Sequence, residues 1–385
     1  MLEEKEYLDK IIQGHVLEVL KEIPSEVVDT AVTSPPYYSL RFYKGANVVW
    51  GGDPECDHEW EFYTRPSNCW SKPGRGLYGV KGEYNKAWIK EHQQAFCKKC
   101  GAWWGQLGLE PHPQMYIDHL VQIFREVKRV LKKTGVFFLN IGDTYWGSLQ
   151  GFGMKRKTKK TGFQNVLEQD QYPGHYFMPP TGSKDITSKW LQPKQKLMIP
   201  SRVAIALQED GWILRNTIIW HKPNHMPHPV KDRLTNAYES IFFFVKNKKY
   251  FFNLDAIREP HIWASKDKRS LLRRVPHKSG KSLTGQYASN AVGYHPLGKN
   301  PGNVWRIKTS SFKGGHFAVF PEELVRKCLI AGCPENGVVL DPFIGSGTTA
   351  VIAKSLGLHY IGIEIVPKYV EMARNRIKGK LDYYL

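Results

Sequence analysis

The chain has 385 residues, of which 41% are hydrophobic and 13% aromatic, enough for one large core with insertions. Lysine and arginine outnumber the acidic residues by 55 to 36, giving a formal net charge of +19 that favours a polyanionic partner such as nucleic acid. A solvated basic surface is the alternative explanation of this charge. No run of about 18 apolar residues predicts a membrane span, and residues 1–10 lack an apolar signal core. We therefore expect a cytoplasmic protein without a membrane partner.

Helical and strand-like runs alternate through the first two thirds of the chain. In residues 115–131, apolar positions recur every three or four residues, which predicts an amphipathic helix. Short apolar runs after each helical segment predict buried strands. The predicted helices are Leu17–Ile23, Met115–Leu131 and Pro200–Gly211, and the predicted strands are Val27–Thr33, Val136–Ile141 and Trp212–Trp220. The runs Ser240–Lys246 and Tyr250–Asn253 follow, separated by three polar residues, and predict a β-hairpin.

The last fifty residues have the pattern of a βαβ unit. Gly337–Asp341 and Tyr360–Glu364 are strand-like, and Thr348–Leu356 between them has helical spacing. The closing helix Pro367–Ile377 begins with proline, which suits a first helical turn. This alternation predicts an α/β fold with a mostly parallel, doubly wound sheet.

Glycines separate the first strand of this unit from its helix. Gly345 and Gly347 would let a ligand approach the backbone, and the following helix would offer unpaired N–H groups. Glu364 ends the next strand about 20 residues on, where an acidic side chain binds ribose hydroxyls in nucleotide-binding folds. The third glycine of the dinucleotide pattern is missing, which argues against a nicotinamide cofactor. An ordinary tight turn is the alternative.

The segment Asp341-Pro-Phe-Ile-Gly-Ser-Gly-Thr-Thr349 resembles the S-adenosylmethionine loop of the amino-group DNA methyltransferases, which act on cytosine N4 or adenine N6. His316–Pro321 resembles the segment that shapes the methionine end of that pocket, and Glu364 the ribose-binding acid. The resemblance implies S-adenosylmethionine as cofactor. The residues that it implies for cofactor binding are Thr33, His316, Phe317, Ala318, Phe320, Pro321, Asp341, Pro342, Phe343, Gly345, Ser346, Gly347, Thr348, Thr349 and Glu364.

The turn Ser34-Pro35-Pro36-Tyr37 follows the strand predicted at 27–33. An exocyclic amine is a poor nucleophile, so it needs acceptors for its hydrogens and a methyl group held in line. The prolines fix the backbone, so that the Ser34 hydroxyl and the Pro35 carbonyl can point at one place. Tyr37 can stack on a base rotated out of the duplex. The resemblance implies that these four residues are catalytic, although a structural proline turn is the alternative.

The family resemblance extends over most of the chain. Asn140–Tyr145, Trp220–Pro227, Glu239–Lys246 and Asn303–Arg306 resemble further family segments in the usual sequence. The catalytic turn precedes the cofactor loop, an order that indicates the permuted, β-type arrangement. The resemblance therefore implies a class I S-adenosylmethionine-dependent methyltransferase fold (Rossmann-like), circularly permuted and carrying inserts.

The expected organisation has two halves and two additions. A catalytic half takes residues 1–52 and 102–260, with a mobile basic loop at 147–189. A cysteine and histidine insert takes 53–101, a target recognition region 261–302, and the cofactor half 303–385. Arginine and lysine side chains in the recognition region suit phosphate contacts, unless it is only a solvated loop. The expected DNA-binding residues are Lys266, Lys268, Arg269, Arg273, Arg274, Lys278 and Lys281.

In the resembling family, serine at the position of Ser34 tends to accompany cytosine N4, and aspartate adenine N6. We expect cytosine N4, with adenine N6 as the alternative. Carbon-5 methylation is disfavoured because the chain has no Pro-Cys pair. More remote alternatives are an RNA or protein-amide methyltransferase and an inactive DNA-binding relative. The expected partners are duplex DNA and a cognate restriction endonuclease in a prokaryotic cytosol or nucleoid, with the protein as monomer or homodimer.

The insert contains two short groups of metal-ligand residue types. Cys56-x-His58 and Cys97-x-x-Cys100 could supply four ligands to a tetrahedral zinc ion. A metal would stabilise a poorly packed insert of this length. Cys69 could replace His58, and a set of reduced free cysteines is the alternative. We expect a structural rather than a catalytic ion.

Overall fold

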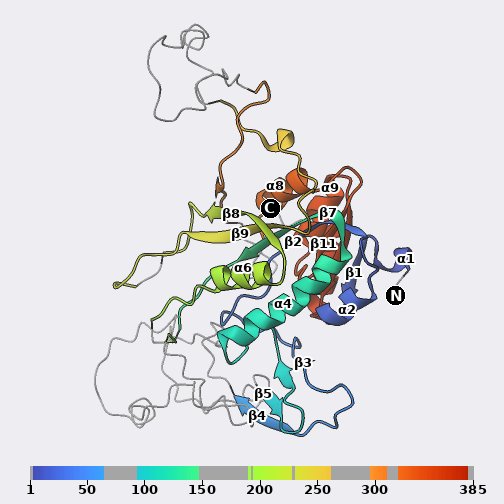
Figure 1. Cartoon of the computed structure of the whole chain (residues 1–385), viewed down its shortest axis with the longest axis vertical. Coiled ribbons are helices and arrows are strands. Elements are labelled where there is room, and N and C mark those ends of the chain that lie inside the picture. Colours follow the sequence, from blue (N-terminus) through green and yellow to red (C-terminus); the bar gives the residue numbers. More distant parts are fainter. Residues whose placement is uncertain are drawn as a thin grey trace.

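The computed structural model describes residues 3–64, 93–146, 190–191, 194–227, 230–261, 295–309 and 320–379. A mixed sheet lies at their centre (Figure 1). Its strands are β1 (Lys10–Gln13), β2 (Val28–Thr33), β7 (Leu131–Ile141), β8 (Ile213–His221), β9 (Tyr238–Val245), β10 (Val304–Arg306), β11 (Val338–Asp341) and β12 (His359–Glu364). Their order is β1-β12-β11-β2-β7-β9-β8-β10, and β9 runs antiparallel to both neighbours while the other pairs are parallel. The predicted α/β class with a mostly parallel sheet is confirmed.

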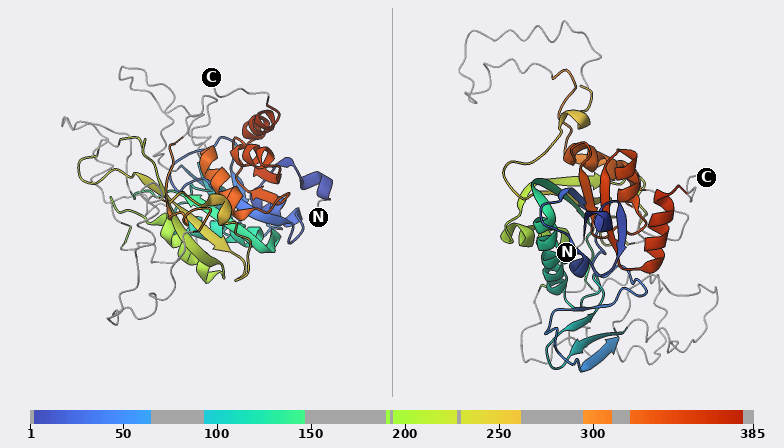
Figure 2. Two further views of the ribbon diagram at one scale, coloured as in Figure 1. Left: turned by 90° about the horizontal axis from the view of Figure 1, so that it is seen from above. Right: turned by 90° about the vertical axis from the view of Figure 1, so that its right-hand side faces the viewer.

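Helices cover both faces of this sheet (Figure 2). The central strands are apolar on both sides: in β7, Phe137 and Leu139 enter one hydrophobic cluster, and Val136 and Phe138 enter the other. The helices α2 (Val16–Glu22), α4 (Pro113–Val130) and α6 (Ile199–Glu209) cover the first face. The helices α8 (Glu322–Gly332), α9 (Thr348–Ser355) and α10 (Pro367–Ile377) cover the second. Two short elements, α1 (Glu4–Tyr7) and the 3₁₀ turn η2 (Asp255–Ile257), lie outside these layers.

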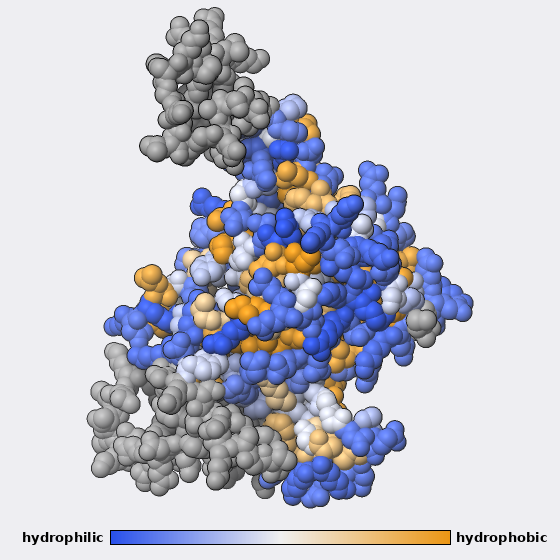
Figure 3. Space-filling view, viewed as in Figure 1, coloured by the Kyte–Doolittle hydropathy of each residue, from blue (hydrophilic) through white to orange (hydrophobic). Residues whose placement is uncertain are grey.

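The amphipathic spacing of residues 115–131 is realised in α4. Pro113 occupies the first turn, and the side chain of His112 caps it by accepting a hydrogen bond from the backbone N–H of Gln114. The apolar stripe, including Leu120 and Phe124, is fully buried against the sheet. On the solvent side, hydrophilic residues cover most of the described surface seen in Figure 3.

A second, antiparallel sheet is inserted between β2 and α4. It comprises β3 (Val48–Trp50), β4 (Trp60–Thr64), β5 (Gln93–Cys97) and β6 (Trp103–Gly105), in the order β3-β6-β5-β4, and lies at one end of the molecule (Figure 1). It docks on α4 through aromatic rings: the ring centroids of Trp50 and Trp103 lie 4.3 and 5.7 Å from that of His119. The buried carboxylate of Glu110 accepts a hydrogen bond from His119 Nδ1 at 2.9 Å. This contact fixes the small sheet against the main core.

One predicted element is wrong. Ser240–Lys246 falls in β9, but β9 pairs with β7 and β8 rather than with Tyr250–Asn253, which form no strand. The backbone of Tyr250–Asn253 leaves the sheet because Phe251 N–H donates to Thr134 O and Asn253 N–H to Ala331 O. A pattern of two apolar runs around a polar turn could not distinguish this crossing from a hairpin.

The sheet brings the two ends of the chain together. β2 and β11 are parallel neighbours, with Ala31 opposite Leu340, so their carboxyl ends emerge at the same edge. The chain continues from β11 toward β12 on one side and from β2 toward β7 on the other, which makes this edge a topological switch point. Ligands of doubly wound sheets bind at such crevices. No helix within the described ranges is long and apolar enough to cross a membrane.

Candidate active site

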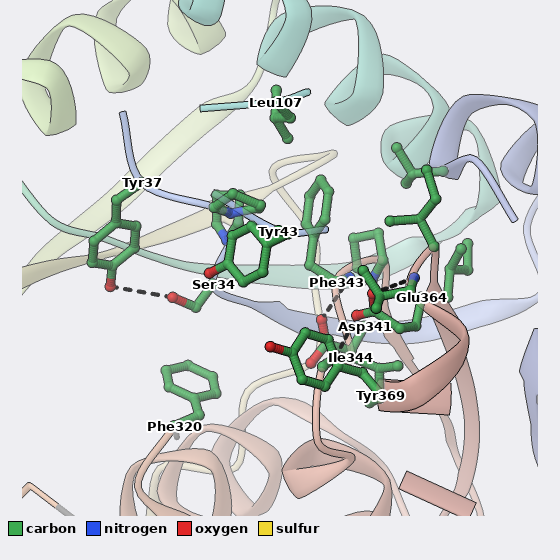
Figure 4. A pocket seen from close by; sticks show the side chains of 18 of the residues that line it. Ser34, Tyr37, Tyr43, Leu107, Phe320, Asp341, Phe343, Ile344, Glu364 and Tyr369 are labelled. Carbon is green, nitrogen blue, oxygen red and sulfur yellow. Dashed lines mark hydrogen bonds between the residues drawn. The ribbon is translucent and has the colours of Figure 1, made fainter. Parts of the chain in front are cut away.

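A cavity of about 390 Å³ opens at this edge of the sheet. It joins the two segments that the sequence places at opposite ends of the chain. Ser34, Pro35, Pro36 and Tyr37 line it together with Asp341 and Glu364. Figure 4 shows Ser34 and Tyr37 on one side and Asp341, Phe343 and Glu364 on the other.

The glycine loop between β11 and α9 is held by its own hydrogen bonds. Gly347 has φ +88°, a left-handed conformation that suits glycine, and a Cβ there would lie 2.8 Å from the Cβ of Ala373 in α10. The loop can therefore turn sharply beneath α10 and present its backbone to the cavity. Ser346 and Thr348 are held by Arg376, whose Nη1 donates to both hydroxyl oxygens at 3.1 and 3.0 Å.

Asp341 ties the two strands to each other. Its carboxylate accepts hydrogen bonds from the hydroxyls of Thr33 in β2 and Thr349 in α9, both at 2.6 Å. Burial raises the pKa of Asp341 to about 6, although the two threonine hydroxyls and the Phe343 N–H act in the opposite direction. Thr33 and Asp341 thus align the Ser34–Tyr37 turn with the Asp341–Thr349 loop.

Glu364 stands at the end of β12 with both carboxylate oxygens directed by the backbone. Oε1 accepts from the N–H of Val366 at 2.8 Å, and Oε2 from the N–H of Gly345 at 3.1 Å. Each oxygen retains a lone pair, so the carboxylate can accept further hydrogen bonds from a diol. Burial raises the pKa of Glu364 to about 7, with a further contribution from Asp341 against the lowering effect of the two N–H groups.

Aromatic side chains form the walls of the cavity (Figure 4). Phe320 and Phe343 were expected from the sequence, whereas Tyr43 and Tyr369 were not. The rings of Tyr43 and Tyr369 meet edge to face with centroids 6.3 Å apart. Tyr43 belongs to the loop before the small sheet and Tyr369 to α10, and no pattern in the sequence indicates that these segments meet.

The Ser34–Tyr37 turn is held in place by hydrogen bonding and packing. Tyr116 Oη of α4 donates a hydrogen bond to the Pro36 carbonyl at 2.8 Å. The ring of Tyr37 packs on Gly142, where a Cβ would lie 2.5 Å from a ring carbon. These contacts fix the turn. Because the Pro36 carbonyl accepts the hydrogen bond from Tyr116, its role is structural.

A polar network connects Ser34 to two residues that the sequence named only within longer segments. Tyr37 Oη donates to Glu239 Oε2 at 2.7 Å, and Asn140 Nδ2 donates to both Tyr37 Oη, at 2.7 Å, and Glu239 Oε2, at 2.9 Å. Lys222 forms an ion pair with the other oxygen of Glu239. The sequence holds one signal for this network: Asn140 is the polar residue in the buried run 136–141 of β7, which is otherwise apolar.

This network determines the direction of the Ser34 hydrogen bond. A carboxylate only accepts, so Tyr37 must donate to Glu239 and can only accept from Ser34 Oγ, 3.2 Å away. Burial, and then the charge of Glu239, raise the pKa of Tyr37 well above its ordinary value, which keeps this donor protonated. The Ser34 hydrogen is therefore directed at Tyr37, and the oxygen lone pairs remain available to an N–H group.

Not every expected residue lines the cavity. Thr33, Pro321 and Gly347 stand behind it: Thr33 binds Asp341, Pro321 precedes α8, and Gly347 packs on α10. Three other predictions fall on segments outside the described residues: the cofactor-binding residues His316, Phe317 and Ala318, the basic loop 147–189, and the DNA-binding residues between 266 and 281. Of the expected recognition region 261–302, the structure describes only residues 261 and 295–302.

The four residues of the expected zinc site come together. Cys56, His58, Cys97 and Cys100 place their nearest ligand atoms within 4.8 Å of one another. They lie at the far edge of the small sheet and are not part of the cavity lining. Cys69 lies outside the described residues.

Comparison with known proteins assigns the chain to one family. Residues 28–375 match the N6/N4 methyltransferase family, described as DNA methylase. The Type II methyltransferase M.SmaI of Serratia marcescens is 33% identical over 368 residues, which cover 96% of this chain and 90% of that protein. The Type II methyltransferase M.Cfr9I of Citrobacter freundii is 31% identical over 370 residues, covering 96% and 88%.

A solved structure supports the same fold. The PvuII DNA methyltransferase (cytosine-N4-specific) aligns with a TM-score of 0.51 at 17% identity, covering 97% of this chain and 87% of that one. This likeness concerns the fold, and it agrees with the mostly parallel sheet of class I S-adenosylmethionine-dependent methyltransferases. With the family match spanning most of the sequence, the chain belongs to the N6/N4 family of DNA methyltransferases.

Proposed function

We propose that the protein transfers a methyl group from S-adenosylmethionine to the exocyclic N4 amine of cytosine in duplex DNA. The observation that carries the proposal is the meeting of the Ser34–Tyr37 turn and the Asp341–Thr349 loop in one cavity. A base must leave the duplex to reach a buried turn of this kind, so the proposal includes base flipping. Methyl transfer is then direct and in line, without a covalent enzyme intermediate: as the N–C bond forms, the sulfur leaves with the electron pair of the broken S–C bond, giving S-adenosylhomocysteine, and the methylated amine releases one proton to solvent.

The residues of the cofactor half fit S-adenosylmethionine. Glu364 offers two directed carboxylate oxygens for the ribose hydroxyls, and the aromatic walls suit an adenine ring. The loop at Gly345 provides close backbone approach. The cofactor supplies an electrophilic methyl group on a positively charged sulfur, and this chain supplies the positioning.

Ser34 and the Pro35 carbonyl act as acceptors for the two amine hydrogens. Holding both hydrogens pulls the nitrogen lone pair out of conjugation and aims it at the methyl group. Ser34 is suited to this task because its own hydrogen is directed at Tyr37. Glu239 and Asn140 are positioning residues in this proposal, since they hold the Tyr37 hydroxyl that fixes Ser34.

The choice of cytosine rests on two features of the same pocket. Serine at position 34 accompanies cytosine N4 in the family more often than adenine N6. In addition, the Watson–Crick edge of cytosine carries two acceptors, N3 and O2, beside its amine, whereas that of adenine carries one acceptor, N1, and a C–H group. Lys222 lines the cavity beside its ion-pair partner Glu239 and offers a donor to such acceptors. Adenine N6 is the second candidate, because the same turn serves both amines.

The proposal also names the partners. The net charge of +19 supports duplex DNA as substrate, and the two Type II relatives make a cognate restriction endonuclease the expected companion.

Transfer of label from methyl-tritiated S-adenosylmethionine tests this function. We expect duplex DNA to be labelled by the wild type and not by Ser34→Ala, while calorimetry shows equal cofactor affinity for both. Label on RNA or protein but not on DNA, or an equally active Ser34→Ala, would contradict the proposal.

A further inference from the structure

We infer that Cys56, His58, Cys97 and Cys100 hold a structural zinc ion at the outer edge of the small sheet. The four ligand atoms approach from two directions. Cys56 and His58 precede β4, whereas Cys97 ends β5 and Cys100 lies in the turn to β6. All four atoms fall within 4.8 Å of one another, although the two groups are about 40 positions apart in the chain.

Two of the six distances between the ligand atoms have the length expected for a tetrahedral site. A Zn–S bond of about 2.3 Å gives an edge of about 3.8 Å between two sulfur ligands, and a somewhat shorter edge between sulfur and nitrogen. The observed separations are 3.9 Å between the Sγ atoms of Cys56 and Cys97, and 3.4 Å from Cys100 Sγ to His58 Nδ1. A disulfide would need about 2.05 Å between sulfurs, and these cysteines are free thiols.

The turn between Cys97 and Cys100 is tightly folded. Gly101 closes it with φ +74° and a 2.9 Å hydrogen bond from its N–H to Cys97 O. Gly52 follows β3 and lets the backbone there pass close to Cys100, since a Cβ at Gly52 would lie 2.8 Å from Cys100 Sγ.

The histidine is oriented in the same way. The ring of His58 packs against that of Trp60, with centroids 4.6 Å apart, which turns Nδ1 toward Cys100. Trp60 is itself the register partner of Cys97 across the β4–β5 pair.

The donor set selects the metal and its role. Three thiolates and an imidazole prefer zinc over magnesium or calcium, which take oxygen ligands. Four protein ligands leave no open position, so the ion is structural. The strands of the small sheet have only three to five residues each. Strands as short as these gain the most stability from a bound metal ion.

The ion has a consequence for the active site. β3 of the same sheet carries Trp50, which lies opposite Trp103 of β6, and the segment after β6 carries Leu107. Trp50 and Leu107 both line the cofactor cavity. Zinc therefore stabilises one wall of the cavity without touching substrate.

Metal analysis of the full-length, untagged protein, purified under reducing conditions without chelator, tests the inference. We expect about one zinc per chain in the wild type, and less than about one tenth in Cys97→Ser and Cys100→Ser. Cys333→Ala is the matched control, because Cys333 is a buried cysteine at the end of α8, and it should retain the metal. His58→Cys should also retain it, since four ligands persist.

Cobalt keeps the inference testable if a serine variant fails to fold. Wild-type protein treated with chelator and then with Co²⁺ should show a sulfur-to-metal charge-transfer band and the intense visible bands of a tetrahedral ion. His58→Cys should shift these bands. The inference is overturned if reduced wild-type protein neither contains zinc nor gives these bands, or if the Cys97→Ser and Cys100→Ser variants keep the metal content of the wild type.

Discussion

Replacing Tyr37 by phenylalanine separates the two roles that its side chain can have. The ring that packs on Gly142 is kept, so stacking on a flipped base survives. The hydroxyl that joins Ser34, Asn140 and Glu239 is lost. The Ser34 hydrogen then has no fixed acceptor in this network, and the serine hydroxyl is free to rotate.

The structure predicts a small loss of stability and a large loss of turnover. Asn140 and Lys222 stay bonded to Glu239 in the variant, so the free energy of unfolding should fall by only about 1–2 kcal/mol, as for one buried hydrogen-bonding group. Loss of alignment at the amine should lower kcat by about 10²-fold, the scale of a misplacement near 1 Å. The cofactor Kd should not change, because Glu364 and the glycine loop are untouched.

The assay is single-turnover methylation of a duplex oligonucleotide, with calorimetry for cofactor affinity. Tyr116→Phe is the matched control, because it also removes one tyrosine hydroxyl, which is bonded to the Pro36 carbonyl. It should lower the free energy of unfolding by a similar amount to Tyr37→Phe, but with a much smaller loss of kcat. In a double-mutant cycle, Tyr37→Phe should add little to Ser34→Ala, since it acts through that serine. The network argument would be refuted if Tyr37→Phe kept full turnover, or if the losses of kcat of Tyr37→Phe and Ser34→Ala, expressed as free energies, added up in the double variant.

Four further predictions follow from other contacts. Gly347→Ala should lower the free energy of unfolding, measured by urea titration, by about 2–4 kcal/mol, because the new Cβ would combine a left-handed φ with a 2.8 Å contact to Ala373. Gly357→Ala is the control: Gly357 has φ +71° but nothing within 4 Å of a Cβ, so its substitution should cost about 1 kcal/mol in the same titration. Cofactor affinity should rise with pH through about 7, since the pKa of Glu364 is raised to about 7 and its ionised form is the better acceptor for hydroxyls. In Glu364→Gln, the cofactor affinity measured by calorimetry should lose this component of its pH dependence. The raised pKa also means that the unliganded protein loses the corresponding stability as pH increases from about 4.5 to about 7. The resulting fall in Tm should be smaller in Glu364→Gln, and the part that Asp341 contributes through its own raised pKa should remain. Lys222→Met should reduce the preference for cytosine over adenine in competition assays by about 10-fold, the scale of one lost base contact, and an unchanged preference would exclude Lys222 as a reader.

The sequence predicts the core of the fold because its signals are local. The alternation of apolar runs and amphipathic helices placed β2, β7, β11 and β12 and their helices within a few residues of the observed bounds. The edge strands β1 and β10 were missed because they are only four and three residues long. The false hairpin at Tyr250–Asn253 shows the limit: which strands pair depends on the whole sheet rather than on the turn between two runs.

The same distinction applies to the site. Ser34–Tyr37 and Asp341–Thr349 are short motifs, so they could be found in the chain, and the order of strands brings them together. Glu239, Tyr43 and Tyr369 could not be found in that way, because each contributes to the cavity only through contacts between distant segments. The cysteine and histidine groups lie between these cases: their spacing indicates a ligand set, and the pairing of β4 with β5 gives it a geometry.

The central claim is that Ser34 and its network hold the amine of cytosine for methylation at N4. Mass spectrometry of nucleosides from duplex DNA treated with the wild-type protein and S-adenosylmethionine tests it directly. We expect N4-methylcytosine, absent from DNA treated with Ser34→Ala. N6-methyladenine as the product, with no methylated cytosine, would contradict the account.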